Sequence, residues 1–269
     1  MDFALLLLVM LLRQEVAALK LLHVNVPAYT LRGNEATLEC RYDLEAETLY
    51  TISWYKDNEE FYRYIPKAEL TKHSYPVEGV KVDHRKSDRG KVVLQDANLH
   101  TSGKYKCEVS AEAPNFHSVN GEANMEVIAL PQERPTITGE EKVYASGDVL
   151  ALNCTSGKSH PAARLKWFVN GQQVNSDSET VLEQHGLLST TSSLLLELKP
   201  GHLASDKINV RCEATVRSSH DTDDRRRVEP FVDTRTTEVF VQGHASLATP
   251  SLCLLMVATL LQLFLPRTV

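Results

Sequence analysis

The segment Lys104-Tyr-Lys-Cys-Glu-Val109 alternates polar and apolar residues, and it places a cysteine on the apolar side. Three other segments have the same short strand-like character: Ala36-Thr-Leu-Glu-Cys40, Tyr50-Thr-Ile-Ser-Trp54 and Lys91-Val-Val-Leu94. Period-two alternation over about four to eight residues indicates half-buried β-strands. No long helical periodicity competes with it between the two termini. The sequence therefore predicts an all-β protein.

The spacing of cysteine and tryptophan predicts which β fold forms. Two groups of the same order occur along the chain: Cys40, Trp54 and Cys107, then Cys154, Trp167 and Cys212. This pattern is typical of an immunoglobulin sandwich, in which a disulfide joins strands B and F and the tryptophan of strand C packs on it. Tyr105 precedes the second cysteine of the first group as the tyrosine corner of that fold does. A zinc site would instead need closely spaced cysteine or histidine pairs, and the sequence has none.

The two copies differ in the length between their cysteines, and the first is the longer. Extra length between strands C and E is where a variable-type domain inserts strands C′ and C″. The segment Glu60-Phe-Tyr-Arg-Tyr-Ile65 alternates like such an added strand. We therefore predict a variable-type sandwich over residues 19–129, a proline-containing linker over 130–135 and a constant-like sandwich over 136–242.

Both ends of the chain have the features of processing signals. Residues 1–18 contain a short apolar run followed by Val16-Ala17-Ala18, which is typical of a secretory signal peptide cleaved after Ala18. Export agrees with the two predicted disulfides, because disulfides persist in oxidising compartments. The apolar stretch near the C-terminus, residues 252–265, is too short as a helix to span the hydrocarbon core of a bilayer.

Residues 243–269 combine small residues, a spacer and a hydrophobic end, which is the pattern of a glycosylphosphatidylinositol signal. Gly243 or Ser246 would be the attachment residue. A short transmembrane helix is the alternative. We therefore expect the protein on the extracellular face of the plasma membrane, held by this C-terminal anchor, with a secreted form as a further alternative.

Several function classes find no support in the residues. The net charge of -6, from 29 basic and 35 acidic residues, argues against nucleic-acid binding. No hydrolase, metalloprotease or phosphate-binding motif is present, so we expect no enzyme activity, no cofactor, no metal and no small-molecule substrate. The run Asp223-Asp-Arg-Arg-Arg227 suggests heparan binding, but acidic neighbours offset its charge and favour a solvated hairpin loop. Asn153, in Asn153-Cys-Thr155, is the one predicted N-glycosylation site, and it should point outward because Cys154 points inward.

Aromatic residues gather over residues 50–64: Tyr50, Trp54, Tyr55, Phe61, Tyr62 and Tyr64. If Trp54 faces the core, Tyr55 faces outward, and one alternate set along residues 61–64 should also face outward. Exposed aromatics beside Arg63 would have the composition of a protein-binding hot spot. The alternative is that these rings only cover the core of the sandwich.

The chain resembles the beaten path (Beat) family of arthropod neuronal proteins in several motifs. In the first domain these are Glu39-Cys-Arg-Tyr-Asp-Leu-Glu45, Trp54-Tyr-Lys56, Glu60-Phe-Tyr-Arg-Tyr-Ile-Pro66, Ser102-Gly-Lys-Tyr-Lys-Cys-Glu-Val-Ser110 and Glu112-Ala-Pro114. In the second domain they are Tyr144, Gly147-Asp148, Asn153-Cys154 and Pro161-Ala162. The resemblance thus covers nearly the whole region between the two terminal signals.

The resemblance implies a role in axon guidance and synaptic partner choice. It also implies heterophilic binding of Sidestep-type immunoglobulin receptors through a sheet face of the first domain, with modest single-site affinity strengthened by clustering on membranes. By position, it assigns partner contact to Tyr55, Phe61, Tyr62, Arg63, Tyr64, Lys106 and Glu108. Homophilic adhesion is the alternative within this class, and a shed, soluble decoy or immune-type binding protein is the alternative outside it.

Overall fold

The computed structural model describes residues 18–140, 143–203, 207–219 and 231–244. The predicted signal peptide up to residue 17, the run at 223–227, Ser246 and the C-terminal apolar stretch lie outside these residues. None of the described segments forms an apolar helix of membrane-spanning length. The described part consists of strands joined by loops and two short 3₁₀ turns, η1 (Leu99–Thr101) and η2 (Pro200–Leu203).

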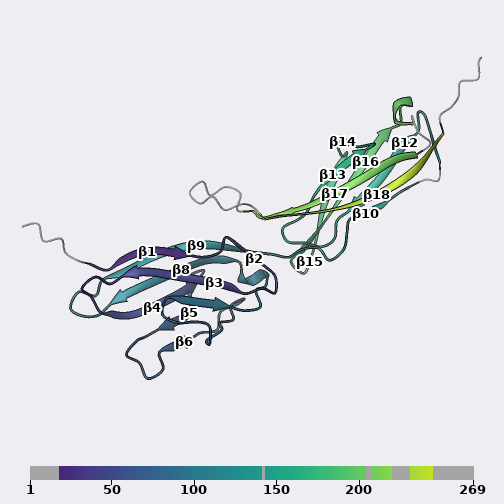
Figure 1. The fold of residues 1–269 in the computed structure, drawn as a ribbon. Helices are drawn as coiled ribbons and strands as arrows, with labels where there is room; N and C mark the ends of the chain where they lie inside the picture. The colour runs from purple at the N-terminus through teal and green to yellow at the C-terminus, as the bar shows by residue number, and fades with distance from the viewer. Residues whose placement is uncertain (1–17, 141–142, 204–206, 220–230, 245–269) are drawn as a thin grey trace, which may run out of the picture.

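The first domain packs two sheets face to face (Figure 1). One sheet has the order β1-β3-β7, with β1 (Lys20–Asn25), β3 (Ala36–Asp43) and β7 (Lys91–Leu94). The other has the order β2-β9-β8-β4-β5-β6, with β2 (Tyr29–Leu31), β9 (Ser118–Ile128), β8 (Gly103–Ala111), β4 (Leu49–Lys56), β5 (Glu59–Tyr64) and β6 (Lys72–Ser74). Strands β5 and β6 extend this sheet beyond β4, where the sequence predicted the extra strands of a variable-type domain.

The second domain is a sandwich of the same kind. Its first sheet has the order β10-β12-β16-β15, with β10 (Thr136–Thr138), β12 (Val149–Thr155), β16 (Leu187–Glu197) and β15 (Ser178–Gln184). Its second sheet has the order β11-β18-β17-β13-β14, with β11 (Tyr144–Ala145), β18 (Val232–His244), β17 (Lys207–Arg217), β13 (Arg164–Val169) and β14 (Gln172–Val174). The predicted all-β architecture of two tandem sandwiches is therefore confirmed.

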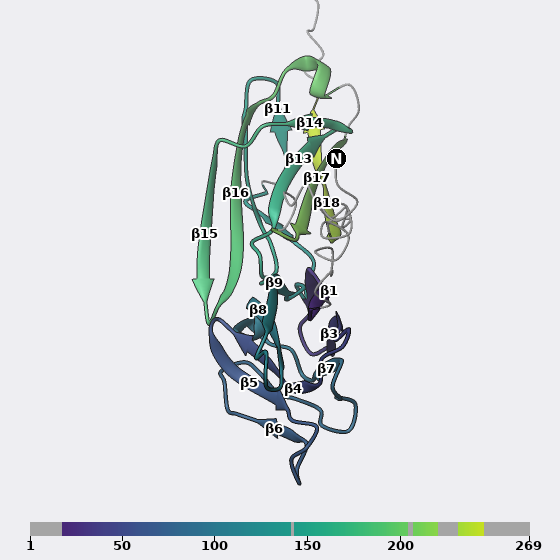
Figure 2. The ribbon, with the colours of Figure 1, turned by 90° about the vertical axis from the view of Figure 1, so that its left-hand side faces the viewer.

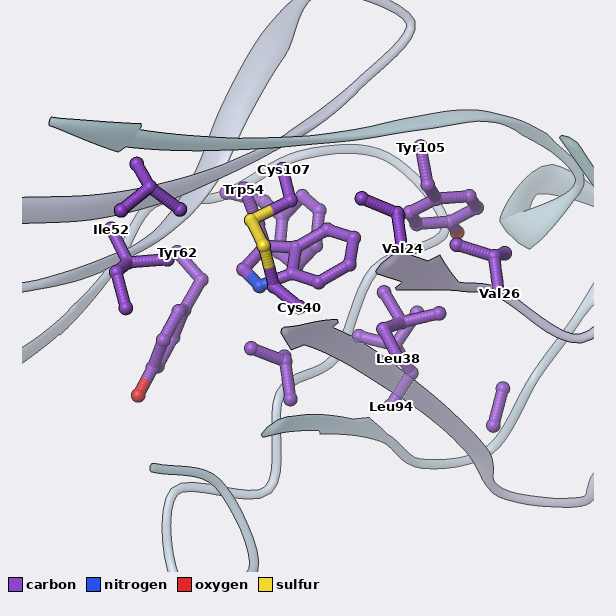
Figure 3. Packing of buried hydrophobic residues seen from close by; sticks show 14 of the residues in the cluster. Val24, Val26, Leu38, Cys40, Ile52, Trp54, Tyr62, Leu94, Tyr105 and Cys107 are labelled. Atoms are coloured by element: carbon purple, nitrogen blue, oxygen red, sulfur yellow. A yellow bond between two sulfur atoms is a disulfide. The ribbon is translucent and has the colours of Figure 1, made fainter. Parts of the chain in front are cut away.

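A disulfide crosses the core of each sandwich. Cys40 on β3 bonds to Cys107 on β8, and the fully buried indole of Trp54 lies against this bridge (Figure 3). The Tyr105 hydroxyl donates a hydrogen bond to the Thr101 carbonyl at 2.6 Å, which forms the expected tyrosine corner. The second core repeats the arrangement around its own bridge and indole, formed by Cys154, Cys212 and Trp167.

The two sandwiches lie end to end with a packed junction (Figure 2). Ala129 and His160 exchange two backbone hydrogen bonds of 2.9 Å across it. The ring of Tyr29 packs on Phe231 at 5.6 Å, within an apolar cluster that joins both domains. The β15–β16 hairpin also extends toward the first domain, and Gly186 at its tip lies beside Leu99.

Candidate partner-binding face of the first domain

The six-stranded sheet of the first domain has one side on the core and one side toward solvent. We call the solvent side the outer face, and its centre comprises Tyr55, Glu60, Arg63, Lys106 and Glu108, together with Ser53, which is on the same side of β4 but is buried by its surroundings. The strand register brings these residues together: Tyr55 is opposite Lys106 and Glu60, and Ser53 is opposite Glu108 and Arg63. Three strands, β4, β5 and β8, therefore contribute to one continuous polar surface.

Tyr55 lies at the middle of the outer face. The Lys106 ammonium stands 4.3 Å from the centroid of its ring, within the range of a cation–π contact. Burial raises the pKa of Tyr55, and the nearby carboxylates of Glu108 and Glu60 raise it further. The phenol therefore stays neutral at physiological pH and can donate a hydrogen bond to a partner.

Arg63 is held beside Tyr55 by a two-pronged ion pair. Its Nε and Nη2 atoms each donate to a Glu60 carboxylate oxygen at 2.6 Å. This hydrogen bonding raises the pKa of the Arg63 guanidinium. The Arg63 side chain is 37% exposed, so a partner can reach it while Glu60 fixes its orientation.

The expectation that Phe61 and Tyr62 contact a partner is wrong, because both side chains are fully buried. A β-bulge is the physical reason: Trp54 pairs with Tyr62 and Tyr55 pairs with Glu60, so Phe61 is an extra residue on β5. The bulge breaks the alternation of the strand, and two consecutive rings enter the core. Phe61 packs edge-on against Tyr105 at 5.9 Å, and the Tyr62 hydroxyl donates to the Asp88 carbonyl at 3.0 Å.

Tyr64 also departs from the prediction. It is opposite the buried Ile52, on the side of β5 away from Arg63, and it packs against the core while remaining half-buried. Most of the aromatic cluster thus covers the core, which is the alternative that the sequence left open. Tyr55 is half-buried on the outer face, and Tyr50 is 56% exposed where β4 begins.

The sequence-based prediction missed Glu60, which orients Arg63. A signal for it exists in the turn Asp57-Asn58, whose two residues both have positive φ, 49° and 73°. A two-residue turn of this kind is typical of a tight β-hairpin, and it sets Lys56 opposite Glu59 and Tyr55 opposite Glu60. Recognising that turn would have placed Glu60 beside Tyr55 from the sequence.

The remaining predicted site residues lie away from this face. Asn153 is exposed on β12, as predicted for a glycosylated residue, and its Oδ1 atom accepts a hydrogen bond from Ser193 Oγ at 2.6 Å. Glycosylation of Asn153 stays a prediction. Gly243 lies within β18, paired with Tyr144. Within the described residues, no group of three or more histidine, cysteine, aspartate or glutamate side chains could hold a metal ion.

Two domain families match this chain. The immunoglobulin V-set domain matches residues 26–128, and the CD80-like C2-set immunoglobulin domain matches residues 131–222. Among curated proteins, basal cell adhesion molecule of Bos taurus is 28% identical over 195 residues, which are 65% of this chain and 30% of the relative. Cell adhesion molecule 2 of Xenopus tropicalis is 25% identical over 185 residues, 68% of this chain and 39% of the relative. The chain thus spans about a third of the length of these relatives.

Solved structures show the same two-domain fold. The D1-D2 fragment of Rst has a TM-score of 0.54 at 17% identity, and the match covers 85% of this chain and 100% of that one. The ectodomain of mouse nectin-like molecule 4 has a TM-score of 0.51 at 17% identity, with 81% of this chain and 66% of that one covered. With the two matched domain families, this chain belongs to the immunoglobulin superfamily and carries a V-set domain followed by a C2-set domain.

Proposed function

We propose that this protein is a cell-surface recognition and adhesion molecule whose first domain binds an immunoglobulin-superfamily partner through the outer face. The observation that carries this proposal is the cluster around Tyr55, where Arg63 and Lys106 are pre-oriented by Glu60 and by the tyrosine ring. Pre-oriented arginine and tyrosine side chains favour binding because less side-chain entropy is lost on association. The names of the curated relatives, which are adhesion molecules, support the same class.

The finer proposal is heterophilic binding of Sidestep-type receptors in axon guidance and synaptic partner choice. It rests on the resemblance to the Beat family in motifs such as Glu60-Phe-Tyr-Arg-Tyr-Ile-Pro66. Two variable-type domains would pack face to face, with the cations Arg63 and Lys106 meeting acidic groups of the receptor. Electrostatic complementarity of this kind supplies specificity and a faster encounter.

Homophilic adhesion is the second candidate, and the charge pattern of the outer face favours it. Arg63 and Lys106 lie beside Glu60 and Glu108, so the surface carries both signs of charge in close proximity. A two-fold interface needs a patch that is complementary to itself, and a patch of mixed charge meets that condition.

Binding to cells that display the full chain tests the proposal. Multimerised Sidestep-type receptor ectodomains are added to these cells, with a multimer of the chain itself in parallel, because weak contacts need avidity. The variants Tyr55→Ala and Lys106→Glu should each lower receptor binding by about tenfold or more, as expected for loss of a hot-spot contact. Lys166→Glu, at an exposed position on β13 of the second domain, is the charge-matched control and should bind like the parent.

Receptor binding that is unchanged in both outer-face variants would contradict the assignment of the face. Binding of the chain only to itself, with loss in the same variants, would replace the heterophilic proposal by the homophilic one. Equal surface levels of all variants exclude misfolding as the cause.

We further propose that a glycosylphosphatidylinositol anchor at Ser246 holds the protein on the cell. Ser246 is preferred to Gly243 because Gly243 pairs with Tyr144 inside β18, where attachment would truncate the strand. Phosphatidylinositol-specific phospholipase C should then release the protein into the medium. Retention on the cells after this treatment would favour the transmembrane alternative, and release without any enzyme would favour the secreted form.

A further inference from the structure

A basic loop lies at the edge of the first sandwich, between β6 and β7. Residues 84–91, His-Arg-Lys-Ser-Asp-Arg-Gly-Lys, contain one acidic side chain, Asp88, among four basic ones: Arg85, Lys86, Arg89 and Lys91. The whole chain has a net charge of -6, so this local excess of positive charge opposes the overall balance. We call it the 84–91 loop.

Neighbouring strands hold the carbonyls of the 84–91 loop. The Lys72 ammonium donates hydrogen bonds to the carbonyls of His84, at 2.6 Å, and Ser87, at 3.0 Å. The Tyr62 hydroxyl donates to the carbonyl of Asp88 at 3.0 Å. Two side chains of the β5–β6 hairpin thus fasten three successive parts of the loop to the sandwich.

The loop is also braced from within. The Ser87 hydroxyl donates to the Asp83 carbonyl at 2.7 Å and accepts from the backbone N–H of Val93 at 3.0 Å. Asp88 Oδ1 accepts hydrogen bonds from the backbone N–H groups of Gly90, at 2.8 Å, and Lys91, at 2.9 Å. With its backbone fixed in this way, the loop loses little entropy when its basic side chains bind a ligand.

Two of the four basic side chains, Arg85 and Arg89, remain open to solvent, whereas Lys86 pairs with Glu35 and Lys91 is half-buried. Arg85 is 94% exposed, with only a distant contact of 3.9 Å to Asp83, and Arg89 is exposed as well. Two guanidinium groups therefore stand on a rigid support. A guanidinium group can donate two hydrogen bonds to two oxygens of one carboxylate or tetrahedral oxyanion such as sulfate.

A cavity of about 540 Å³ opens beside Arg89, and its lining comprises Tyr64, Lys72, Asp88, Arg89 and Gly90. Its volume falls within the range of small-molecule sites. Tyr42 lies next to it: burial raises the pKa of Tyr42, and the Arg89 guanidinium partly opposes that shift. Phenol rings and a carboxylate suit the faces and hydroxyl groups of a sugar, while the cations suit its anionic substituents.

We propose that the 84–91 loop and Lys72 form a binding site for a sulfated glycosaminoglycan, in which Arg85 and Arg89 contact sulfate groups and Tyr64 contacts a sugar ring. A glycan is favoured over an anionic lipid because the loop belongs to the first domain, whereas His244, which leads to the predicted anchor, ends the second (Figure 2). Tyr64 and Arg63 point to opposite sides of β5, so the glycan site is separate from the outer face. Both surfaces can therefore be occupied at once.

The test uses cells that lack glycosaminoglycans of their own and display the full chain. Fluorescent heparin is the probe. The affinity of the variant Arg85→Gln/Arg89→Gln for heparin should be lower than that of the parent by about tenfold or more, since each lost charge-assisted contact weakens binding. Arg164→Gln/Lys166→Gln, with the same charge change at exposed positions of β13, is the control and should bind like the parent. Binding to the parent should weaken as NaCl is raised, because exposed ion pairs are screened.

Three further measurements distinguish a sulfated glycan from free sulfate and from an anionic lipid as the ligand. Desulfated heparin should not bind, and inorganic sulfate should compete only weakly, because a single anion engages one contact. Vesicles containing phosphatidylserine should bind no better than neutral vesicles. The proposal is overturned if Arg85→Gln/Arg89→Gln binds heparin like the parent, if desulfated heparin binds equally well, or if only the anionic vesicles bind. Loss of heparin binding confined to a variant of Arg225, Arg226 and Arg227 would also overturn it.

Discussion

Replacing Phe61 by alanine is expected to lower the free energy of unfolding of the first domain by about 3–5 kcal/mol, as for other buried phenylalanines. The side chain is fully buried and packs against Tyr105 in the same core cluster as the Cys40–Cys107 bridge. Its removal would leave a cavity that the two disulfide-linked sheets cannot easily close. Denaturant unfolding of the purified, oxidised protein, followed by tryptophan fluorescence, measures the change.

The matched control is Tyr50→Ala, which removes an aromatic ring at a position that is 56% exposed on the neighbouring strand. Its effect should stay within about 0.5 kcal/mol, as for most surface substitutions. If Phe61→Ala instead left the stability unchanged and abolished partner binding, Phe61 would belong to the interface after all, and the placement of the bulge in β5 would be refuted.

Removal of the first disulfide by Cys40→Ala/Cys107→Ala should cost about 4 kcal/mol of stability in the chain-entropy model. The bridge links residues separated by 67 positions, and without it the unfolded chain regains the freedom of that long loop. The same model gives the second bridge, with a separation of 58, nearly the same effect, smaller by only about 0.1 kcal/mol. The same unfolding measurement, carried out on each double variant, compares the two bridges directly.

Cys253→Ala, made in the full unprocessed chain, is the control for this experiment, because Cys253 takes part in neither bridge and lies in the predicted C-terminal signal. It should leave the unfolding transition unchanged. Unaltered stability in Cys40→Ala/Cys107→Ala would show that the packing around Trp54 alone supports the sandwich.

The architecture was predictable because its signals are local and repeated. Alternation along segments such as Lys104–Val109 depends only on which side chains face the core, and the order of cysteine and tryptophan occurs twice. The outward orientation of Tyr55 and Lys106 followed from the same alternation, counted from Trp54 and Cys107. Wherever a strand stays regular, counting residues from a core position was sufficient.

The prediction failed where the regular period is interrupted. The bulge at Phe61 is a property of the β4–β5 pairing, so no residue of β5 read alone discloses it. Because of the bulge, Phe61 and Tyr62 both face the core. The outer face is therefore polar, where the sequence predicted exposed aromatic rings. Of the seven residues that the family resemblance assigned to partner contact, the outer face retains Tyr55, Arg63, Lys106 and Glu108.

By itself, then, the sequence determined the fold class, the two disulfides and the core tryptophans. The alternation of a half-buried strand and the order of cysteine and tryptophan can both be recognised without knowing how the strands pair. Only the tertiary structure decided which aromatic rings are exposed and which residues lie beside the basic 84–91 loop. Lys72, Tyr42 and the 84–91 loop come from three separate segments, and no spacing in the chain connects them. The ammonium of Lys72 and the hydroxyl of Tyr62 hold the loop in place, because they satisfy backbone carbonyls that the loop would otherwise leave unpaired.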